Sequence, residues 1–146
     1  MPPWFLRHQV TLLVFLLVLW LIALSNQRAV RRLGSVQPTG QTPFVSILVP
    51  ARNEATRIGA CLSSLLCQDY PHYEVLAMDE NSIDNTWAVL VGLSQSHARL
   101  TVLRSQPLPA GWLGKHWACH QLSQLAKGEL LLFTDADTWH HPHALA

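Results

Sequence analysis

The sequence predicts an α/β domain with a mostly parallel sheet, preceded by one N-terminal transmembrane helix. Beyond residue 43, short β-rich runs alternate with segments of helical periodicity. Such alternation is typical of a parallel sheet with helices on both faces. Before residue 43, the segment 10–24 is apolar and uncharged. A third observation concerns function, because polar residues cluster where three of the predicted strands end.

The N-terminal helix is predicted from residues 10–24, and its flanking charges favour a membrane anchor. The run is shorter than the roughly 20 residues of a typical spanning helix. A cleaved signal peptide, with Ala23-Leu24-Ser25 as a loose cleavage site, and a soluble or interfacial helix are the alternatives. One arginine precedes the run and three follow it, namely Arg7, then Arg28, Arg31 and Arg32. This excess predicts an anchor over residues 1–27, single-pass in the inner or plasma membrane, with the globular part cytoplasmic.

Residues 28–43 contain two glycines and two prolines and are predicted to be a linker. The chain has three cysteines, Cys61, Cys67 and Cys119, without a Cys-x-x-Cys pair. They are predicted to be small, partly buried thiols, which agrees with a reducing cytoplasm. The formal net charge of +1 and the lack of a basic block argue against a nucleic acid partner.

Four strands are predicted in the remaining domain, residues 44–146. They are 44–49, closed by Pro50, then 73–78, 100–103 and a buried strand over 129–134.

Three helices are predicted between the strands from the spacing of apolar residues. They cover 54–68 with Ile58, Cys61, Leu62, Leu65 and Leu66 inward, a helix capped by Asp84 with Trp87, Leu90 and Val91 on one face, and 115–127 with Ala118, Leu122, Leu125 and Ala126 inward. Gly128 is predicted to stop the third helix.

Three polar clusters, 51–54, 79–84 and 135–137, follow predicted strands. In a parallel sheet they should meet on one rim, where like charges disfavour the fold unless a cation or ligand offsets them. Asp135 and Asp137 follow the last strand and can turn oxygens toward one Mg²⁺ or Mn²⁺. Each cluster alone has a structural interpretation, as a helix start, an N-cap or a turn.

Other motifs are absent or uninformative. A dinucleotide-binding G-x-G-x-x-G and a phosphate-binding G-x-x-x-x-G-K-[ST] are both missing. His116 and His120 are predicted to be surface or packing residues, and His140, His141 and His143 a solvated loop, with one of these three lining the metal site as the alternative.

The segments VSILVPARNE, MDENSIDNT and GKHWACHQLSQLAKGELLLFTDAD together resemble the nucleotide-sugar-binding half of a family 2 inverting glycosyltransferase with the GT-A fold. The loop 107–115 further resembles the membrane-associated branch that includes hopanoid-associated and carotenoid glycosyltransferases. The resemblance covers residues 44–146, the N-terminal portion of such a Rossmann-like domain. It implies transfer of a hexose, with inversion, from a nucleotide diphosphate sugar to a lipid or glycan hydroxyl. A UDP-sugar donor and a divalent cation, Mg²⁺ or Mn²⁺, are implied with it.

The resemblance also implies roles for individual residues. Four residues would border the nucleoside, Asp79 would hold the uracil ring, and Lys115 would lie near the donor. The four are Pro50, Ala51, Asn53 and Glu54. Asp135 and Asp137 would hold the ribose and the metal-bridged diphosphate.

The chain departs from the family pattern in two ways. The family often has Asp-Asp-x-Ser where this chain has 79–82, Asp-Glu-Asn-Ser. The acceptor-binding segment and the catalytic base would lie beyond Ala146, so no catalytic residue is assigned. The chain is expected to be a fragment, a truncated gene product or one half of a split enzyme. A non-catalytic, membrane-anchored nucleotide-sugar-binding module is the alternative function. A nucleotidyltransferase is a weaker one, because residues 50–54 are not a Gly-rich basic loop.

Overall fold

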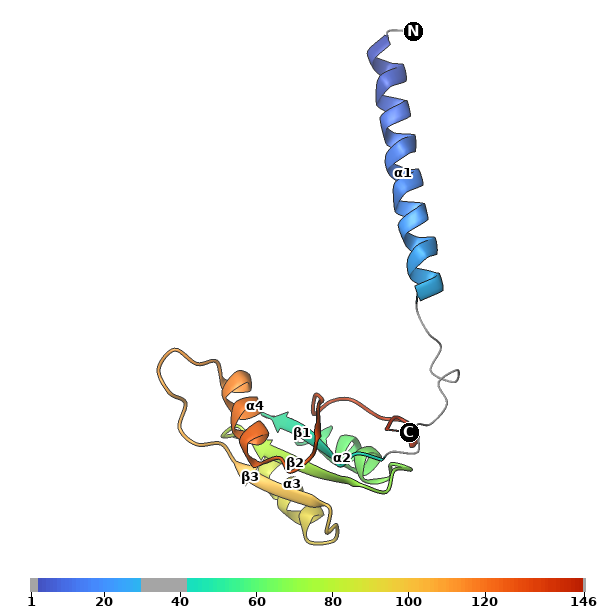
Figure 1. The fold of residues 1–146 in the computed structure, drawn as a ribbon. Helices are drawn as coiled ribbons and strands as arrows, with labels where there is room; N and C mark the ends of the chain where they lie inside the picture. The colour runs from blue at the N-terminus through green and yellow to red at the C-terminus, as the bar shows by residue number, and fades with distance from the viewer. Residues whose placement is uncertain (1–2, 30–41, 146) are drawn as a thin grey trace. The chain divides into compact units, whose positions relative to one another are not determined.

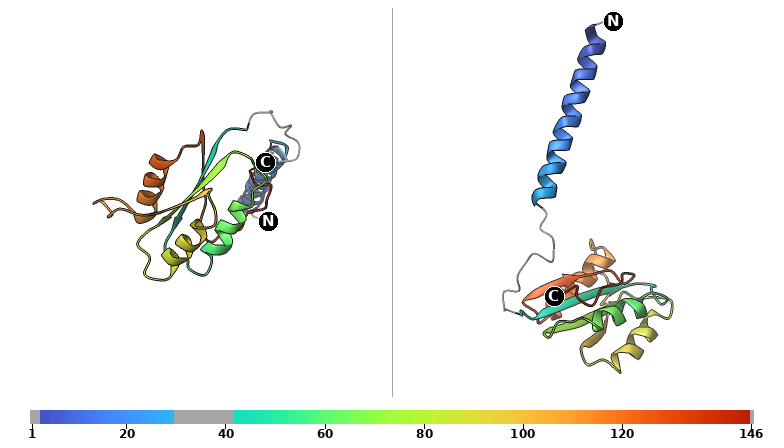
Figure 2. Two further views of the ribbon diagram at one scale, coloured as in Figure 1. Left: turned by 90° about the horizontal axis from the view of Figure 1, so that it is seen from below. Right: turned by 90° about the vertical axis from the view of Figure 1, so that its right-hand side faces the viewer.

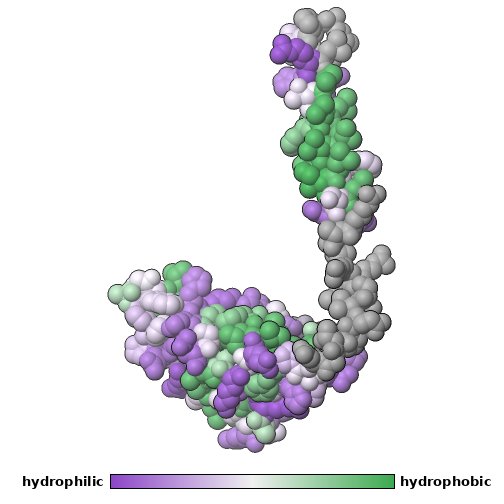
Figure 3. Space-filling model, viewed as in Figure 1, coloured by the Kyte–Doolittle hydropathy of each residue, from purple (hydrophilic) through white to green (hydrophobic). Residues whose placement is uncertain are grey.

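The computed structural model describes residues 3–29 and 42–145, in two units divided after Gln41 (Figure 1). Residues 30–41, most of the predicted linker, lie outside the described residues, so the linker boundaries stay a prediction. In the first unit, α1 runs from Pro3 to Ala29 as one helix. Its 21-residue stretch Arg7–Gln27 is long and apolar enough to cross a membrane, by length and composition. Figure 3 shows hydrophobic side chains around the middle of this helix.

The second unit contains the predicted parallel sheet. In the described residues it has four strands in the order β3-β2-β1-β4, all neighbours being parallel. The strands are β1 Val45–Ala51, β2 Tyr73–Asp79, β3 Leu100–Arg104 and β4 Leu130–Phe133. This confirms the predicted α/β fold class.

Strand β1 is longer than predicted, because it continues through Pro50 to Ala51. Proline has no N–H for a sheet ladder and is tolerated where one side is unpaired. The ladder between β1 and β4 ends at Leu48, opposite Phe133, so Pro50 lies beyond it. On the other side Ala51 pairs with Asp79. The carboxyl ends of β1 and β2 therefore lie level with each other.

Helices cover both faces of the sheet (Figure 2). Helices α2, Ile58–Leu66, and α3, Thr86–Ser94, lie on one face, and α4, Gly114–Leu125, lies on the other. The larger core lies under α2 and α3 and includes Ile47, Val49, Leu62 and Leu90, all fully buried. The smaller core joins Leu48, Leu76, Met78, Ala118 and Leu122.

Several predicted helix details are wrong. Helix α2 begins at Ile58 and not at Glu54, because a turn precedes it in which the N–H groups of Arg57 and Ile58 both donate to the Glu54 carbonyl. Asn85, not Asp84, directly precedes α3, although the Asp84 carboxylate accepts the Thr86 N–H at 3.0 Å. Val91 is not among the residues packed in the core, where Val89 and Leu93 accompany Leu90. On α4, Leu125 is 49% exposed.

Strand β4 was predicted to be buried and is not. Leu130, Leu131 and Phe133 are 54%, 42% and 47% exposed. The cause is position, since β4 is the edge strand and, in the described residues, pairs only with β1. Its apolar run therefore presents a half-covered face and an unpaired edge.

Gly128 does not stop α4, which ends at Leu125, but lies where two chain segments nearly touch. A Cβ at Gly128 would stand 2.4 Å from the Ser46 backbone nitrogen and 2.8 Å from the Phe44 carbonyl oxygen. The buried Ser46 hydroxyl accepts the Gly128 N–H at 2.8 Å and donates to Glu74 at 2.7 Å. These contacts join the beginnings of β1 and β2 to the chain entering β4.

Candidate functional site

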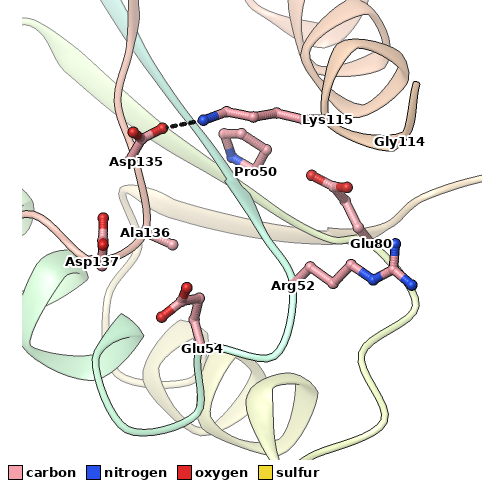
Figure 4. Close-up of a pocket in the computed structure, with 9 residues that line it drawn as sticks. All are labelled: Pro50, Arg52, Glu54, Glu80, Gly114, Lys115, Asp135, Ala136 and Asp137. Atoms are coloured by element: carbon pink, nitrogen blue, oxygen red, sulfur yellow. Dashed lines mark hydrogen bonds and ion pairs between the residues drawn. The ribbon is translucent and has the colours of Figure 1, made fainter. Parts of the chain in front are cut away.

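The predicted rim contains a pocket of about 430 Å³ at the carboxyl ends of β1, β2 and β4, beside the first turn of α4 (Figure 4). Nine residues line it: Pro50, Arg52, Glu54, Glu80, Gly114, Lys115, Asp135, Ala136 and Asp137. Three of the four chain segments contribute a carboxylate. Because parallel strands all end on the same rim, residues that are up to 87 positions apart, such as Pro50 and Asp137, face one space.

Lys115 and Asp135 form the shortest ion pair of the pocket. The Lys115 ammonium donates to Asp135 Oδ1 at 2.5 Å, across the pocket from α4 to the turn after β4 (Figure 4). This hydrogen bond raises the pKa of Lys115 above its ordinary value. Both side chains are more than half exposed, so solvent screens the pair and a charged ligand can compete for either partner.

Asp137 faces a second cation, Arg57, in the turn before α2. The Arg57 guanidinium lies 3.7 Å from Asp137 and 3.9 Å from Glu54. The arginine is 63% exposed, which makes these contacts loose surface pairs. Each of the two carboxylates after β4 thus has its own cationic neighbour.

Glu80 is a pocket carboxyl whose pKa is shifted by its surroundings. Burial raises the pKa of Glu80, while the positive charges of Arg52 and Lys115 oppose part of that rise. Gly114 leaves the space that Glu80 uses, since a Cβ there would stand 3.1 Å from Glu80 Oε2. The pocket therefore pairs a partly desolvated carboxyl with two cations.

Hydrogen bonds join the loops after β1 and β2. The Asn53 N–H donates to the Ser82 hydroxyl at 2.9 Å, and the Ile83 N–H donates to Asn53 Oδ1 at 2.9 Å. The Glu54 N–H donates to the Thr86 hydroxyl at 2.8 Å. Asn53 adopts its positive φ within this arrangement, a conformation that asparagine tolerates better than most residues. The two loops form one connected support for the pocket.

The turn 135–137 is anchored at its centre. Ala136 is 5% exposed and packs in the core under α2, so its two aspartate neighbours flank a fixed point. The Asp135 carbonyl accepts the Thr138 hydroxyl at 2.7 Å and the Cys61 thiol at 3.5 Å. Burial raises the pKa of that thiol, which keeps its proton available for donation.

The structure brings together some, but not all, of the predicted site residues. Pro50, Glu54, Lys115, Asp135 and Asp137 line the pocket, whereas Ala51, Asn53 and Asp79 do not. Asp79 is 2% exposed, and its carboxylate accepts the Ser82 N–H at 3.3 Å. Asn53 and Asp79 therefore support the loops that carry the lining residues.

Sequence reasoning missed four of the lining residues: Arg52, Glu80, Gly114 and Ala136. Arg52 and Glu80 lie inside clusters that the sequence did indicate, so their charge was an available signal. The roles of Gly114 and Ala136 depend on tertiary distances, and a single sequence carries no signal for them.

The donor set fits a hard divalent cation. Asp135 and Asp137 are exposed carboxylates flanking one anchored residue, and Mg²⁺ is commonly held by one or two carboxylates together with phosphate oxygens and water. Within residues 3–29 and 42–145 there is no group of three His, Cys, Asp or Glu placed to hold a metal ion. None of His140, His141 and His143 lines the pocket. A cation here would need ligand oxygens to complete its coordination.

A smaller pocket of about 210 Å³ adjoins the first and shares Arg52, Glu80 and Gly114 with it. Its other walls include Leu108 and Trp117. The Trp117 ring centroid lies 5.2 Å from that of Trp112 and 5.5 Å from that of His120. His120 is thus a packing residue, as predicted.

Comparisons with known proteins agree on one family. Residues 46–146 match the profile described as Glycosyl transferase family 2. A beta-monoglucosyldiacylglycerol synthase of Nostoc sp. is 40% identical over 100 residues, which are 67% of this chain and 21% of the synthase. A 4,4'-diaponeurosporenoate glycosyltransferase of Staphylococcus aureus is 34% identical over 93 residues, 64% of this chain and 24% of that enzyme.

Two solved structures show the same fold. S. aureus TarS 1-349 in complex with UDP is 30% identical, with a TM-score of 0.59 over 70% of this chain and 30% of that one. The mannosyltransferase PcManGT from Pyrobaculum calidifontis, in complex with GDP-Man and Mn²⁺, is 29% identical, with a TM-score of 0.66 over 82% of this chain and 35% of that one. The chain thus spans between 21% and 35% of the length of these relatives.

Proposed function

Because the chain belongs to glycosyl transferase family 2, we propose that its rim pocket binds the nucleotide diphosphate sugar from which a hexose is transferred, with inversion, to a lipid or glycan hydroxyl. The donor in this proposal is a UDP-sugar, and the bound cation is Mg²⁺ or Mn²⁺. The observation that carries the proposal is the position of Asp135 and Asp137 opposite Lys115 and Arg57, on the rim where β1, β2 and β4 end.

The charges of the pocket suit a diphosphate with a cation. Lys115 and Arg57 already neutralise the two aspartates, so a diphosphate can take over the basic groups as the aspartates turn to the cation. A bound divalent cation would stabilise the negative charge of the departing diphosphate. Arg52, beside Glu80, is the second basic residue on the lining, together with Lys115.

In this proposal the residues predicted to border the nucleoside divide into two groups. Pro50 and Glu54 line the pocket directly. Ala51 and Asn53 act through the connected loops after β1 and β2, which hold the lining in place. Asp79 would hold the uracil ring, because a carboxylate that accepts the Ser82 N–H at 3.3 Å on one oxygen keeps further acceptor sites on the other.

The proposal is tested by UDP binding to the full chain in detergent, measured by calorimetry with and without Mn²⁺. We expect the cation to tighten binding, and Asp137→Asn to abolish that increment while leaving metal-free binding unchanged. Loss of a charge-assisted contact costs about 1.5–3 kcal/mol, or roughly 10- to 150-fold in affinity. Asp69→Asn is the matched control, because Asp69 is an exposed carboxylate beyond the other end of α2.

Two results would contradict the proposal. If the wild-type chain does not bind UDP in the presence of Mn²⁺, the pocket is not a donor site. If Asp137→Asn and Asp69→Asn bind UDP equally well with Mn²⁺, Asp137 is not a cation ligand.

We also propose that α1 anchors the chain in the inner or plasma membrane, with the pocket on the cytoplasmic side. Support comes from the length of Arg7–Gln27 and from the excess of arginine after that stretch. Fusion of a reporter to the C-terminus tests the orientation in a bacterial host. Activity of a cytoplasm-specific reporter is expected, and activity of a periplasm-specific reporter would contradict the orientation.

A further inference from the structure

His140 takes part in a compact hydrogen-bonded triangle behind the turn that carries the two aspartates. Its Nε2 atom lies 2.9 Å from the Thr134 hydroxyl and 2.9 Å from the Thr138 hydroxyl. The two hydroxyls are 3.0 Å from each other. Thr134 precedes Asp135 and Thr138 follows Asp137, so the triangle closes the turn at its base.

The number of hydrogens in the triangle decides whether His140 Nε2 is a hydrogen-bond donor or an acceptor. The Thr138 hydroxyl donates its one hydrogen to the Asp135 carbonyl, which can only accept. The Thr138 oxygen must then accept a hydrogen bond in its contacts with both Thr134 and His140. An unprotonated Nε2 would place two lone pairs 2.9 Å apart, so Nε2 must carry a hydrogen. This assignment follows from the hydrogen-bond network.

His140 is itself held in place from the far side. Its backbone N–H donates to the Ser64 hydroxyl on α2 at 3.1 Å, and the half-buried ring has little freedom to leave. The next residues are tied to the same helix end, since Gln68 Nε2 donates to the His141 carbonyl at 3.0 Å. These bonds fix the backbone of His140 to the end of α2, beside the turn.

We propose that His140 is a positioning residue whose Nε2–H clamps Thr134 and Thr138 and so holds Asp135 and Asp137 in the arrangement that receives the cation and the diphosphate. The inference rests on the proposed function and goes beyond it, because His140 is not among the residues that line the pocket. Removing a group that orients metal ligands typically lowers metal affinity 10- to 100-fold. We expect a loss of about this size from a residue that is absent from the pocket lining.

The test compares three variants of the full chain in detergent. His140→Phe keeps a planar ring without the donor, and His140→Gln places an amide N–H donor near the position of Nε2. His141→Phe is the matched control, because the His141 ring contacts His143 and Trp139 and makes no contact with the triangle. For each variant, UDP binding is measured with and without Mn²⁺, and hydrogen–deuterium exchange is measured over residues 134–138.

We expect His140→Phe to weaken Mn²⁺-dependent UDP binding about 10- to 100-fold and to speed exchange in the turn, with metal-free binding unchanged. His140→Gln should restore most of the affinity, and His141→Phe should match the wild type. In ¹⁵N-histidine spectra, the signal that disappears in the His140 variants should show a protonated Nε2. His140→Gln removes the same signal, so the assignment does not depend on the folding of His140→Phe.

Three results would overturn the inference. They are equal Mn²⁺-dependent affinity in His140→Phe and wild type, equal loss in His140→Gln and His140→Phe, and an unprotonated Nε2. Absence of Mn²⁺-dependent binding in the wild type is a different outcome. It overturns the proposed function, and with it the cation role assigned to the clamp.

Discussion

Replacement of Gly128 by alanine should destabilise the sheet unit strongly, although the residue is far from the pocket. The added Cβ would stand 2.4 Å from the Ser46 nitrogen and 2.8 Å from both the Phe44 oxygen and the Ser46 hydroxyl oxygen. Two of these atoms belong to the backbone entering β1, so relief requires one chain segment to move away from the other.

The expected magnitude combines two effects. Overpacking of a tight site costs about 1–3 kcal/mol. Separation of the segments also stretches the bond from the Gly128 N–H to the buried Ser46 hydroxyl, which contributes about 1 kcal/mol. We expect the free energy of unfolding to fall by about 2–4 kcal/mol, a large part of the roughly 5–15 kcal/mol of a typical domain.

The assay must report on the sheet unit and not on α1. Cys61 on α2 is 1% exposed, so with Cys67 and Cys119 both replaced by serine its labelling by a thiol reagent in increasing urea measures unfolding of this unit. Gly92→Ala is the matched control, because Gly92 lies inside α3 and a Cβ there meets nothing within 4 Å. Alanine at that position should raise stability by about 0.5–1 kcal/mol.

The two substitutions are chemically identical and should have opposite signs. If Gly128→Ala lies within about 0.5 kcal/mol of the wild type, the segment can shift at little cost and the steric argument is wrong.

Three further predictions concern charge and exposure. Burial raises the pKa of Glu80 above its ordinary 4.5, so this carboxyl favours folding at low pH and loses that contribution as pH rises through the raised pKa. The urea midpoint of unfolding, followed by tryptophan fluorescence, should therefore fall less between pH 4.5 and 7 in Glu80→Gln than in the wild type. An equal fall in the two proteins would contradict the role of burial. Asp84 has the opposite sign, because hydrogen bonds from Thr86 lower its pKa below 3.8 and the stability it provides is lost as pH falls through the lowered pKa. Asp84→Asn should abolish that acid-side loss, measured in the same way, and a variant that still loses stability in acid as the wild type does would refute it. Leu131→Glu on the unpaired edge strand should reduce concentration-dependent association in light scattering, whereas Leu125→Glu on α4, at similar exposure, should not. Equal effects of the two substitutions would assign association to general hydrophobicity.

The sequence predicted the burial of the central strand β1 better than that of the edge strand β4. Strand β1 is buried at all seven positions and reads as a continuous apolar run, which is typical of a central parallel strand. Strand β4 has the same kind of run but lies at the edge. An apolar composition does not distinguish an edge strand from a central one, and the predicted burial of Leu131 and Phe133 was therefore wrong.

The location of the site at one rim of the sheet was predictable from the sequence, whereas the contacts of individual side chains were not. Parallel topology alone places residues 51–54, 79–84 and 135–137 together, and members of all three ranges line the pocket. Which way each side chain turns depends on local bonds, as when the Ser82 N–H holds the Asp79 carboxylate in a buried position. The Nε2 contacts of His140 are likewise tertiary, so the sequence indicated only a solvated loop.

The bonds between the loops after β1 and β2 have a consequence for the entropy of binding. A ligand that must order a loose loop loses affinity to the conformational freedom it removes. Here Asn53 is hydrogen-bonded to both Ser82 and Ile83 and has a left-handed backbone angle. The backbone of the loops that carry Arg52, Glu54 and Glu80 is thus held by bonds within the chain. Adaptation to different ligands is left to the long, exposed side chains of Lys115 and Arg57, which can change rotamer without moving the backbone.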